Sequence, residues 1–247
     1  MKRADDNSGL LPIASSDCTG WHLTPEGAAV HLAERTAVIA DVHLGYEWAR
    51  GSRGDMVPAH SLPETLQKLS SLIRRVALER LIVAGDLVES RRPCAPTARD
   101  VRALESWLIE RGIRLDILQG NHDPPRTPPC PVSLELGGWT ITHGHRTVES
   151  SRLMIGHHHP ILKGEGIRAP AYLLSRSLIV LPAFSDNAAG LDVSSSALPP
   201  DLVGRNYRLV AGLDGLLLDF GPLANLRRAP GVVEAEPIPE KTPGRRG

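Results

Sequence analysis

The chain has 247 residues, of which 41% are hydrophobic and 23% are charged, an ordinary balance for a globular protein. Its 28 basic and 28 acidic side chains cancel, which argues against global charge as the basis of binding to nucleic acid or an anionic membrane. The three cysteines are too few and too widely spaced for a disulfide scaffold. No signal peptide or membrane-spanning run is evident, so we expect a cytoplasmic protein.

The chain divides by composition into three parts. Residues 1–20 are polar and broken by glycine and proline, and we expect a flexible entry. Residues 21–225 carry the apolar runs of a folded domain. Residues 226–247 are rich in proline, glycine and charge, which predicts a disordered tail.

The first half of the domain alternates strand and helix patterns. A hairpin is predicted first, and three later runs have the continuity of buried strands: residues 21–32 for the hairpin, then 37–40, 81–84 and 113–118. After a predicted loop at residues 45–58, Ser61 and Glu64 fit a capping box that opens one helix. A second helix is predicted from Thr97 to Gly112. This alternation predicts an α/β fold with a parallel sheet flanked by helices.

The second half has short strands and little helical periodicity. The predicted strands are residues 139–142, 153–155, 171–174 and 178–181, followed by a late hairpin of residues 207–210 and 216–220. We therefore expect a strand-rich second half.

Five polar fragments each follow an apolar run. They read Asp41-Val-His43, Gly85-Asp86, Gly120-Asn-His-Asp123, His143-Gly-His145 and Gly156-His-His-His159. Because loops at the carboxyl ends of parallel strands converge on one crevice, we expect these fragments to form one site.

The side chains of these fragments are typical metal ligands. In extended segments, residues two apart share a face, so Asp41 is expected beside His43, and His157 beside His159. The candidate ligands are Asp41, His43, Asp86, Asn121, His143, His157 and His159, with His145 as an alternative to His143. Seven groups exceed the needs of one tetrahedral ion, and a bridging Asp86 would divide them between two ions. Mixed nitrogen and oxygen donors favour Mn, Fe, Zn, Co or Ni over Ca or Mg.

Such a pair of divalent ions, about 3.5–4 Å apart, can clamp a phosphoryl group and activate a shared water. The departing oxygen then needs a proton, for which His122 is the candidate general acid. Asp123 either orients the His122 ring or caps its loop. The predicted reaction is metal-dependent hydrolysis of phosphate monoesters or diesters, with a phosphorylated small molecule or a nucleic acid as substrate.

Other residues are candidates for supporting roles. Arg50, Arg91, Arg126 and His145 are candidate substrate contacts because they lie in loops beside the ligand fragments. Glu89 either partners a ligand imidazole or caps a helix or loop. A non-catalytic phosphate-sensing or scaffold module is the alternative of a different class.

The ordered fragments, spanning residues 41–159, resemble the calcineurin-like metallophosphoesterase superfamily. The resemblance implies a four-layer α/β/β/α sandwich with two central mixed sheets and His122 as proton donor. It also implies one metal site made of Asp41, His43, Asp86 and His159, and a second made of Asp86, Asn121, His143 and His157.

Two further segments, residues 40–47 and 181–190, resemble the small bacterial and archaeal branch that includes ligase-associated DNA-damage-response phosphoesterases. That branch often has Gly-Glu-Phe where this chain has Ser185-Asp-Asn187. The resemblance implies a DNA-end phosphoesterase or nuclease as an alternative function.

Overall fold

The computed structural model describes residues 2–3, 9–13, 20–164, 166–194 and 198–227. Almost all of the predicted tail, from residue 228 onward, lies outside the described residues. Two short pieces of the predicted entry form strands, β1 (Lys2–Arg3) and β2 (Leu11–Pro12). They do so by pairing with strands of the main body. The division into entry, domain and tail stays a prediction.

The smaller sheet contains the predicted hairpin and the three predicted parallel strands. Its order is β2, β3 (Trp21–Leu23), β4 (Ala29–His31), β5 (Thr36–Ile39), β6 (Arg80–Val83) and β7 (Arg114–Ile117). The strands from β2 to β5 pair antiparallel, whereas β5, β6 and β7 are parallel. The sheet is therefore mixed.

The larger sheet is built mainly from the second half of the chain, as predicted, and is also mixed. Its main path runs β1, β16 (Leu216–Pro222), β15 (Arg208–Leu213), β12 (Ile167–Leu174), β13 (Leu178–Val180), β10 (Leu153–Ile155), β9 (Trp139–Thr142) and β8 (Ser133–Leu136). Strands β11 (Pro160–Gly164) and β14 (Leu191–Asp192) extend it beyond β12. Strands β8, β11 and β14 were not predicted.

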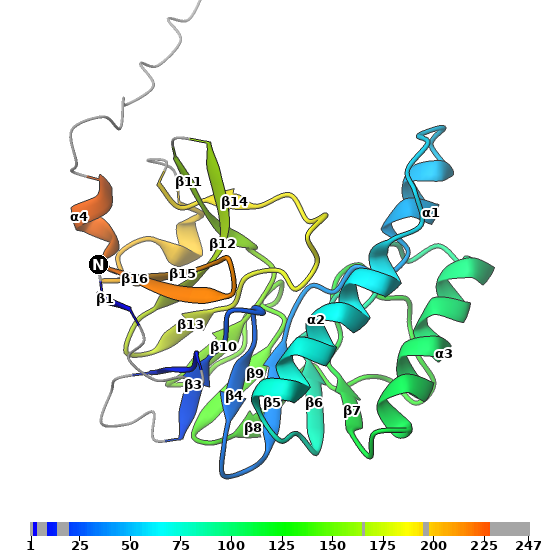
Figure 1. The fold of residues 1–247 in the computed structure, drawn as a ribbon, viewed down its shortest axis with the longest axis horizontal. Coiled ribbons are helices and arrows are strands. Elements are labelled where there is room, and N and C mark those ends of the chain that lie inside the picture. Colours follow the sequence, from blue (N-terminus) through cyan, green and yellow to red (C-terminus); the bar gives the residue numbers. More distant parts are fainter. Residues whose placement is uncertain (1, 4–8, 14–19, 165, 195–197, 228–247) are drawn as a thin grey trace, which may run out of the picture.

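Two long helices, α2 (Ser61–Arg75) and α3 (Ala95–Ile109), cover one face of the smaller sheet (Figure 1). Leu69 and Leu72 of α2 pack with Ile39 and Val83 of the sheet in one buried cluster, as the helical spacing of the leucines predicts. No helix among the described residues is long and apolar enough to cross a membrane.

Two details of the helix prediction were wrong. The loop predicted at residues 45–58 contains a short helix, α1 (Tyr46–Gly51). Ser61 is the first residue of α2, and the cap residue is His60. The Ser61 Oγ instead accepts a hydrogen bond from the Gly45 amide (3.1 Å) and donates one to Glu47 (3.1 Å). The serine thus ties α1 to α2.

A second apolar cluster joins the two sheets. Val38 and Ile82 of the smaller sheet are buried with Trp139, Ile141 and Ile179 of the larger one. A third cluster lies within the larger sheet and includes Leu202 of the 3-10 helix Pro200–Leu202 and Leu223 of α4 (Leu223–Arg227). The structure is therefore an α/β fold in which two mixed sheets share an apolar core that includes buried aromatic rings.

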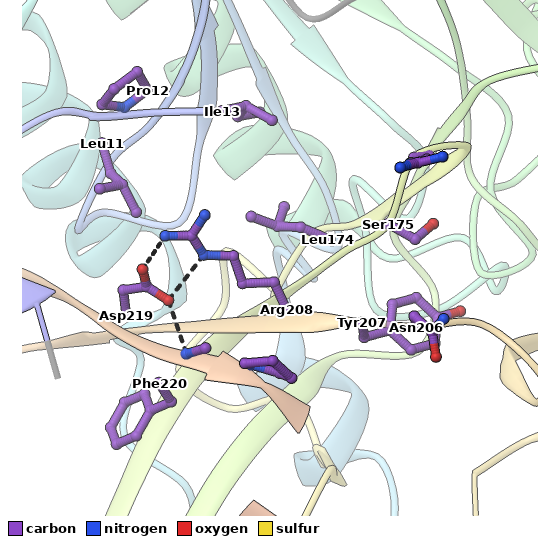
Figure 2. Close-up of a pocket in the computed structure, with 13 residues that line it drawn as sticks. Leu11, Pro12, Ile13, Leu174, Ser175, Asn206, Tyr207, Arg208, Asp219 and Phe220 are labelled. Atoms are coloured by element: carbon purple, nitrogen blue, oxygen red, sulfur yellow. Dashed lines mark hydrogen bonds and ion pairs between the residues drawn. The ribbon is translucent and has the colours of Figure 1, made fainter. Parts of the chain in front are cut away.

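A cavity of about 630 Å³ lies where β2 approaches β15 and β16 (Figure 2). Its charged pair is satisfied internally, because Arg208 Nε lies 3.0 Å from Asp219 Oδ1, which also accepts the Gly221 amide at 2.9 Å. None of the candidate metal ligands lines this cavity.

Tyr172 provides a test of how the sheets are joined. Its buried hydroxyl, on β12, donates to the carbonyl of Thr24 in the β3–β4 turn at 2.7 Å. Tyr172→Phe should lower the free energy of unfolding by about 1 kcal/mol, measured by urea denaturation. Tyr207→Phe is the matched control, because the buried Tyr207 hydroxyl has no hydrogen-bond partner among the described residues. Equal losses in both variants would contradict the role of the Tyr172 bond.

Candidate metal centre

The five polar fragments converge, as predicted, where the parallel strands of both sheets end. Asp41, Asp86 and Asn121 follow β5, β6 and β7 of the smaller sheet, whereas His143 and His157 follow β9 and β10 of the larger sheet. Strands β5, β6 and β7 are mutually parallel, and so are β9 and β10. Each sheet therefore places candidate ligands at the carboxyl ends of its strands.

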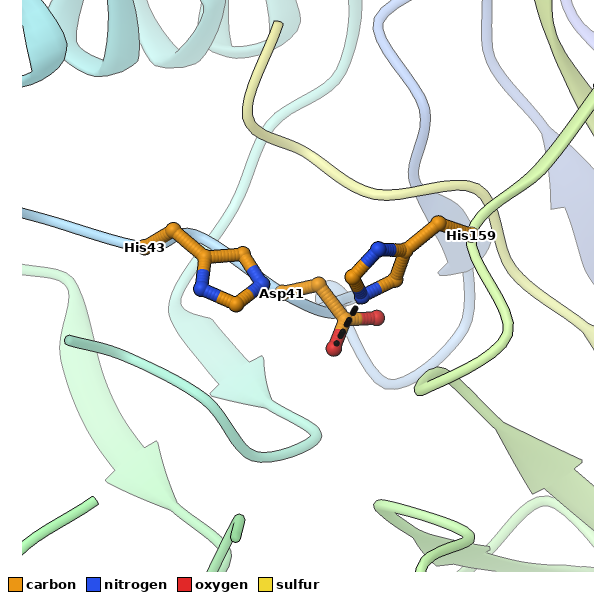
Figure 3. Close-up of side chains that lie close together, drawn as sticks. All are labelled: Asp41, His43 and His159. Carbon is orange, nitrogen blue, oxygen red and sulfur yellow. Dashed lines mark ion pairs between the residues drawn. The ribbon is translucent and has the colours of Figure 1, made fainter. Parts of the chain in front are cut away.

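Asp41, His43 and His159 form the first ligand group (Figure 3), with one donor atom of each lying within 4.8 Å of the others. Asp41 Oδ1 lies 3.1 Å from His159 Nε2. Even so, among the described residues neither atom has a hydrogen bond of good geometry, and nor does either ring nitrogen of His43. Buried polar atoms are nearly always partnered, so this donor set fits a bound cation.

A second group consists of Asp41, Asp86 and His143, all of them buried. His143 Nε2 lies 3.3 Å from Asp86 Oδ2 and 2.8 Å from Asn121 Oδ1. The two groups share Asp41. The predicted ligand Asn121 lies beside the second group through its contact with His143. Carboxylate, amide and imidazole donors thus meet in one buried cluster.

Backbone carbonyl groups orient three of the imidazole rings. Nδ1 of His143 donates to Ala84 O (3.1 Å), Nδ1 of His159 to Ala189 O (3.0 Å), and Nδ1 of His122 to Glu89 O (2.7 Å). Because a carbonyl only accepts, Nδ1 carries the proton in each ring, which leaves Nε2 of a neutral ring free to bind a metal. The sequence carried no signal for these carbonyl partners.

Glu89 lies beside a candidate ligand. Its Oε2 is 3.0 Å from His43 Nδ1 but without hydrogen-bond geometry, so a role as partner of this imidazole stays a prediction. Donor atoms of His43, Glu89 and His122 also form a third compact group. The His43 and His122 rings meet edge to face, with 5.3 Å between their centroids.

The backbone around the ligands is not extended, so the expected alternation of side chains was the wrong reason for their convergence. Five candidate ligands have positive φ angles: Asp41 (57°), His43 (51°), Asp86 (49°), His157 (66°) and His159 (47°). Such left-handed conformations are rare and costly for residues other than glycine.

Two of the candidate carboxylates also accept hydrogen bonds from nearby backbone amides. Asp41 Oδ2 accepts from His157 N (2.9 Å), and Asp86 Oδ1 accepts from His122 N (2.8 Å).

Two glycines allow the backbone to approach these carboxylates. A Cβ atom on Gly156 would lie 2.4 Å from Asp41 Oδ2, and one on Gly120 would lie 2.1 Å from both the amide nitrogen and Oδ1 of Asp86. Both distances are far below van der Waals contact. The two glycines are therefore required by close packing against the candidate ligands.

The carboxylates and imidazoles shift one another's protonation. Burial raises the pKa of Asp86, but its hydrogen bond and charge interaction with His143 outweigh that effect and lower the pKa to about 2. Burial lowers the pKa of His143 and His159, but Asp86 and Asp41 outweigh it and raise both values. The pair of buried carboxylates therefore attracts cationic partners.

The remaining histidines divide by position. The His157 ring meets the His143 ring edge to face, with 5.0 Å between the ring centroids. Burial together with the charges of His143 and His158 lowers the pKa of His157 to about 4. It is thus a neutral donor beside the second group, although no compact group includes it. His145 lies 5.1 Å from the His143 ring. His158 pairs with Asp201 at 2.7 Å, and so points away as predicted.

Asp123 and two of the three candidate arginines have structural partners. The Asp123 carboxylate accepts the amides of Gly120 (3.0 Å) and Val88 (3.2 Å), so it caps the loop. Arg50 pairs with Asp55 at 2.8 Å, and Arg126 lies 3.8 Å from Glu105. Arg91 is exposed. Contacts of these arginines with a substrate stay predictions.

No known protein-family profile matches the chain. The structure is similar to the crystal structure of Pseudomonas putida nuclease MPE, with a TM-score of 0.60 and 23% sequence identity. The match covers 80% of this chain and 94% of that one. At this level of identity, the similarity shows a shared fold.

Replacing Gly156 tests whether close packing sets the position of Asp41. Gly156→Ala should weaken Mn²⁺ binding by at least about tenfold, because the new methyl group must displace the Asp41 carboxylate. Gly164→Ala is the matched control, since a Cβ there meets nothing within 4 Å. Calorimetric titration of Mn²⁺ into both variants measures the effect, and unchanged affinity in Gly156→Ala would contradict it.

The raised pKa values of His143 and His159 predict opposite pH trends with and without metal. Protons held more tightly in the native state stabilise it fully below the unfolded pKa of 6.5, and this stability is lost as pH rises through the native pKa values. Metal binding needs neutral imidazoles, so stabilisation by Mn²⁺ should grow from about pH 6 to about pH 8. Thermal melts with EDTA and with Mn²⁺ measure both trends. An equal Mn²⁺-induced shift at the two pH values would contradict the involvement of these rings.

Proposed function

We propose that the protein is a dinuclear metal-dependent phosphoesterase of the calcineurin-like superfamily, which hydrolyses phosphate monoesters or diesters. The observation that carries the proposal is the buried cluster in which Asp41 and Asp86 both lie beside His143, while Asp41 Oδ1, His159 Nε2 and both ring nitrogens of His43 make no hydrogen bond of good geometry among the described residues. Two mixed sheets with helices over the smaller one support the proposed four-layer arrangement.

The proposed ligand sets divide the cluster at Asp86. One set is Asp41, His43, Asp86 and His159, and the other is Asp86, Asn121, His143 and His157. Two bound divalent ions, Mn²⁺ foremost with Fe, Zn, Co or Ni as alternatives, would supply Lewis-acid activation of the phosphoryl group and hydroxide at neutral pH. The mixture of imidazole, amide and carboxylate donors is the basis for this choice.

His122 is the proposed proton donor to the leaving oxygen. Its Nδ1 is held by Glu89 O at 2.7 Å, so the ring is fixed and Nε2 remains to carry the transferable proton. Its own amide donates to Asp86 Oδ1 at 2.8 Å, which couples the position of the ring to the cluster. His122 thus serves the leaving group while its neighbour Asn121 serves the metals.

A nucleic-acid substrate is the second candidate. The similar solved structure is of a protein called a nuclease, which favours a phosphodiester substrate and agrees with the DNA-end phosphoesterase alternative. The net charge of zero means that any such binding must rest on a local basic surface. The cytoplasmic location stays a prediction. A non-catalytic sensing role is a less favoured alternative function.

Replacing His122 tests the proposed mechanism. With Mn²⁺ and an alkyl phosphodiester, His122→Ala should lower kcat by about 10²–10⁴-fold, because the poor leaving group loses its proton donor. The loss should be smaller with bis(p-nitrophenyl) phosphate, whose leaving group needs little protonation. Mn²⁺ affinity should stay near that of the unaltered protein, since His122 lies outside both proposed ligand sets.

The control is His22→Ala, because His22 lies on β3, outside the cluster, and is partly exposed. It should hydrolyse both esters at the normal rate. Equal losses in His122→Ala with the alkyl and aryl esters would remove His122 as the acid. Inactivity of the unaltered protein with each of the five metals would overturn the enzyme assignment.

A further inference from the structure

A second cavity, of about 610 Å³, adjoins the loop that carries His122. Ser90 in its wall follows Glu89, whose carbonyl holds the His122 ring. Pro124, which also lines the cavity, lies two residues after His122. The cavity and the candidate proton donor are therefore built on the same two loops.

The lining of this cavity is apolar with a positive rim. Its apolar part consists of Val88, Pro93, Ala95, Ala98, Val101 and Pro124. Arg92, Arg102 and Arg126 supply the charge, and no carboxylate lines the cavity among the described residues. Arg126 interacts with the charge of Asp123, and it forms an ion pair with Glu105 at 3.8 Å. At that distance the guanidinium retains donors for a ligand.

The first turn of α3 adds to this positive character. Ala95, Thr97 and Ala98 line the cavity, and the first turn contains no acidic residue. The residue before the helix, Cys94, makes no side-chain capping bond. The partial positive charge of the helix start is therefore uncompensated by acidic side chains from its own turn.

We propose that this cavity binds the leaving portion of the substrate, and that this portion is a nucleotide. The inference rests on the proposed function, because a general acid must lie within reach of the leaving oxygen, so the group that carries this oxygen extends on the His122 side. The base packs on the apolar wall and on a guanidinium plane. A further phosphate on the leaving nucleoside binds the arginines, whose paired donors match phosphate oxygens.

The reaction at this subsite is hydrolysis of a phosphodiester. The oxygen of hydroxide forms the new bond to phosphorus, and the bond from phosphorus to the oxygen of the leaving nucleotide breaks. The proton on His122 Nε2 passes to that oxygen. A nucleotide with a free hydroxyl is released and the other product keeps the phosphate.

The cavity of Figure 2 provides a contrast that favours this choice. It is of similar size, and Arg208, one of its two arginines, is engaged by Asp219 through two hydrogen bonds, which leaves the exposed Arg176 as its second positive charge. Arg92 and Arg102, by comparison, are exposed at the rim of the cavity beside His122. Anion binding is therefore expected beside His122.

Adenosine 5′-monophosphate is the probe, because it combines an aromatic base with one phosphate. Binding is measured by calorimetry in EDTA, so that phosphate cannot bind through metals. The probe should bind at least about tenfold more tightly than adenosine or inorganic phosphate alone. Arg102→Gln and Ala98→Trp, which fills the cavity from an exposed position, should each weaken binding by about tenfold. Arg99→Gln is the control, since Arg99 is exposed on the same helix but does not line the cavity.

Each outcome decides the proposal. Absence of binding, or equal weakening by Arg99→Gln and Arg102→Gln, would overturn the nucleotide subsite. Tighter binding of phosphate than of the nucleotide would reduce the cavity to an anion site and would also overturn it. Weaker nucleotide binding in Arg102→Gln and Ala98→Trp, with unchanged binding in Arg99→Gln, supports the subsite. If the unaltered protein then hydrolyses no ester with any metal, only the proposed catalytic function fails.

Discussion

The burial of two carboxylates is the constraint on which the rest of the structure depends. Asp41 and Asp86 are 0% and 1% exposed, and an unpaired buried charge costs far more than a fold of this size can lose. Local amides satisfy one oxygen of each group. His143 and His159 lie beside these carboxylates, which raise the pKa of both imidazoles, and in the proposed enzyme divalent ions would compensate the carboxylate charge. The loops and rings around the two carboxylates are arranged so that the buried negative charge is compensated.

Two sheets are needed because neither one alone carries the full donor set. Parallel strands of the smaller sheet deliver the carboxylates and the Asn121-His122 pair, whereas parallel strands of the larger sheet deliver His143 and the His157–His159 segment. The apolar cluster between the sheets fixes this relation. The glycines at positions 120 and 156 then allow loops to approach the carboxylates more closely than a Cβ atom would permit. The packing of the two sheets therefore also determines how the candidate ligands are brought together.

The sequence predicted that the polar fragments converge, but it did not predict the backbone conformation that brings them together. Apolar runs that end on Asp41 and Asp86 identify the strands and the edge at which their loops meet, and this was confirmed. The left-handed backbone at Asp41 and His43 was not predictable, since it depends on the amides and loops that surround those residues. Backbone carbonyls that orient His143 and His159 likewise leave no trace in residue types. Helix α1 is too short to show a helical period of apolar residues, and the contacts of Ser61 that tie it to α2 leave no sequence pattern.

The central claim is that the buried cluster binds two metal ions. A crystal structure of the Mn²⁺-soaked protein, with anomalous difference maps on both sides of the manganese absorption edge, tests this claim most directly. We predict two peaks about 3.5–4 Å apart, one beside Asp41, His43 and His159 and the other beside Asn121, His143 and His157, with Asp86 between them. A map with no peak in the cluster, or with manganese only elsewhere on the protein, would contradict the claim.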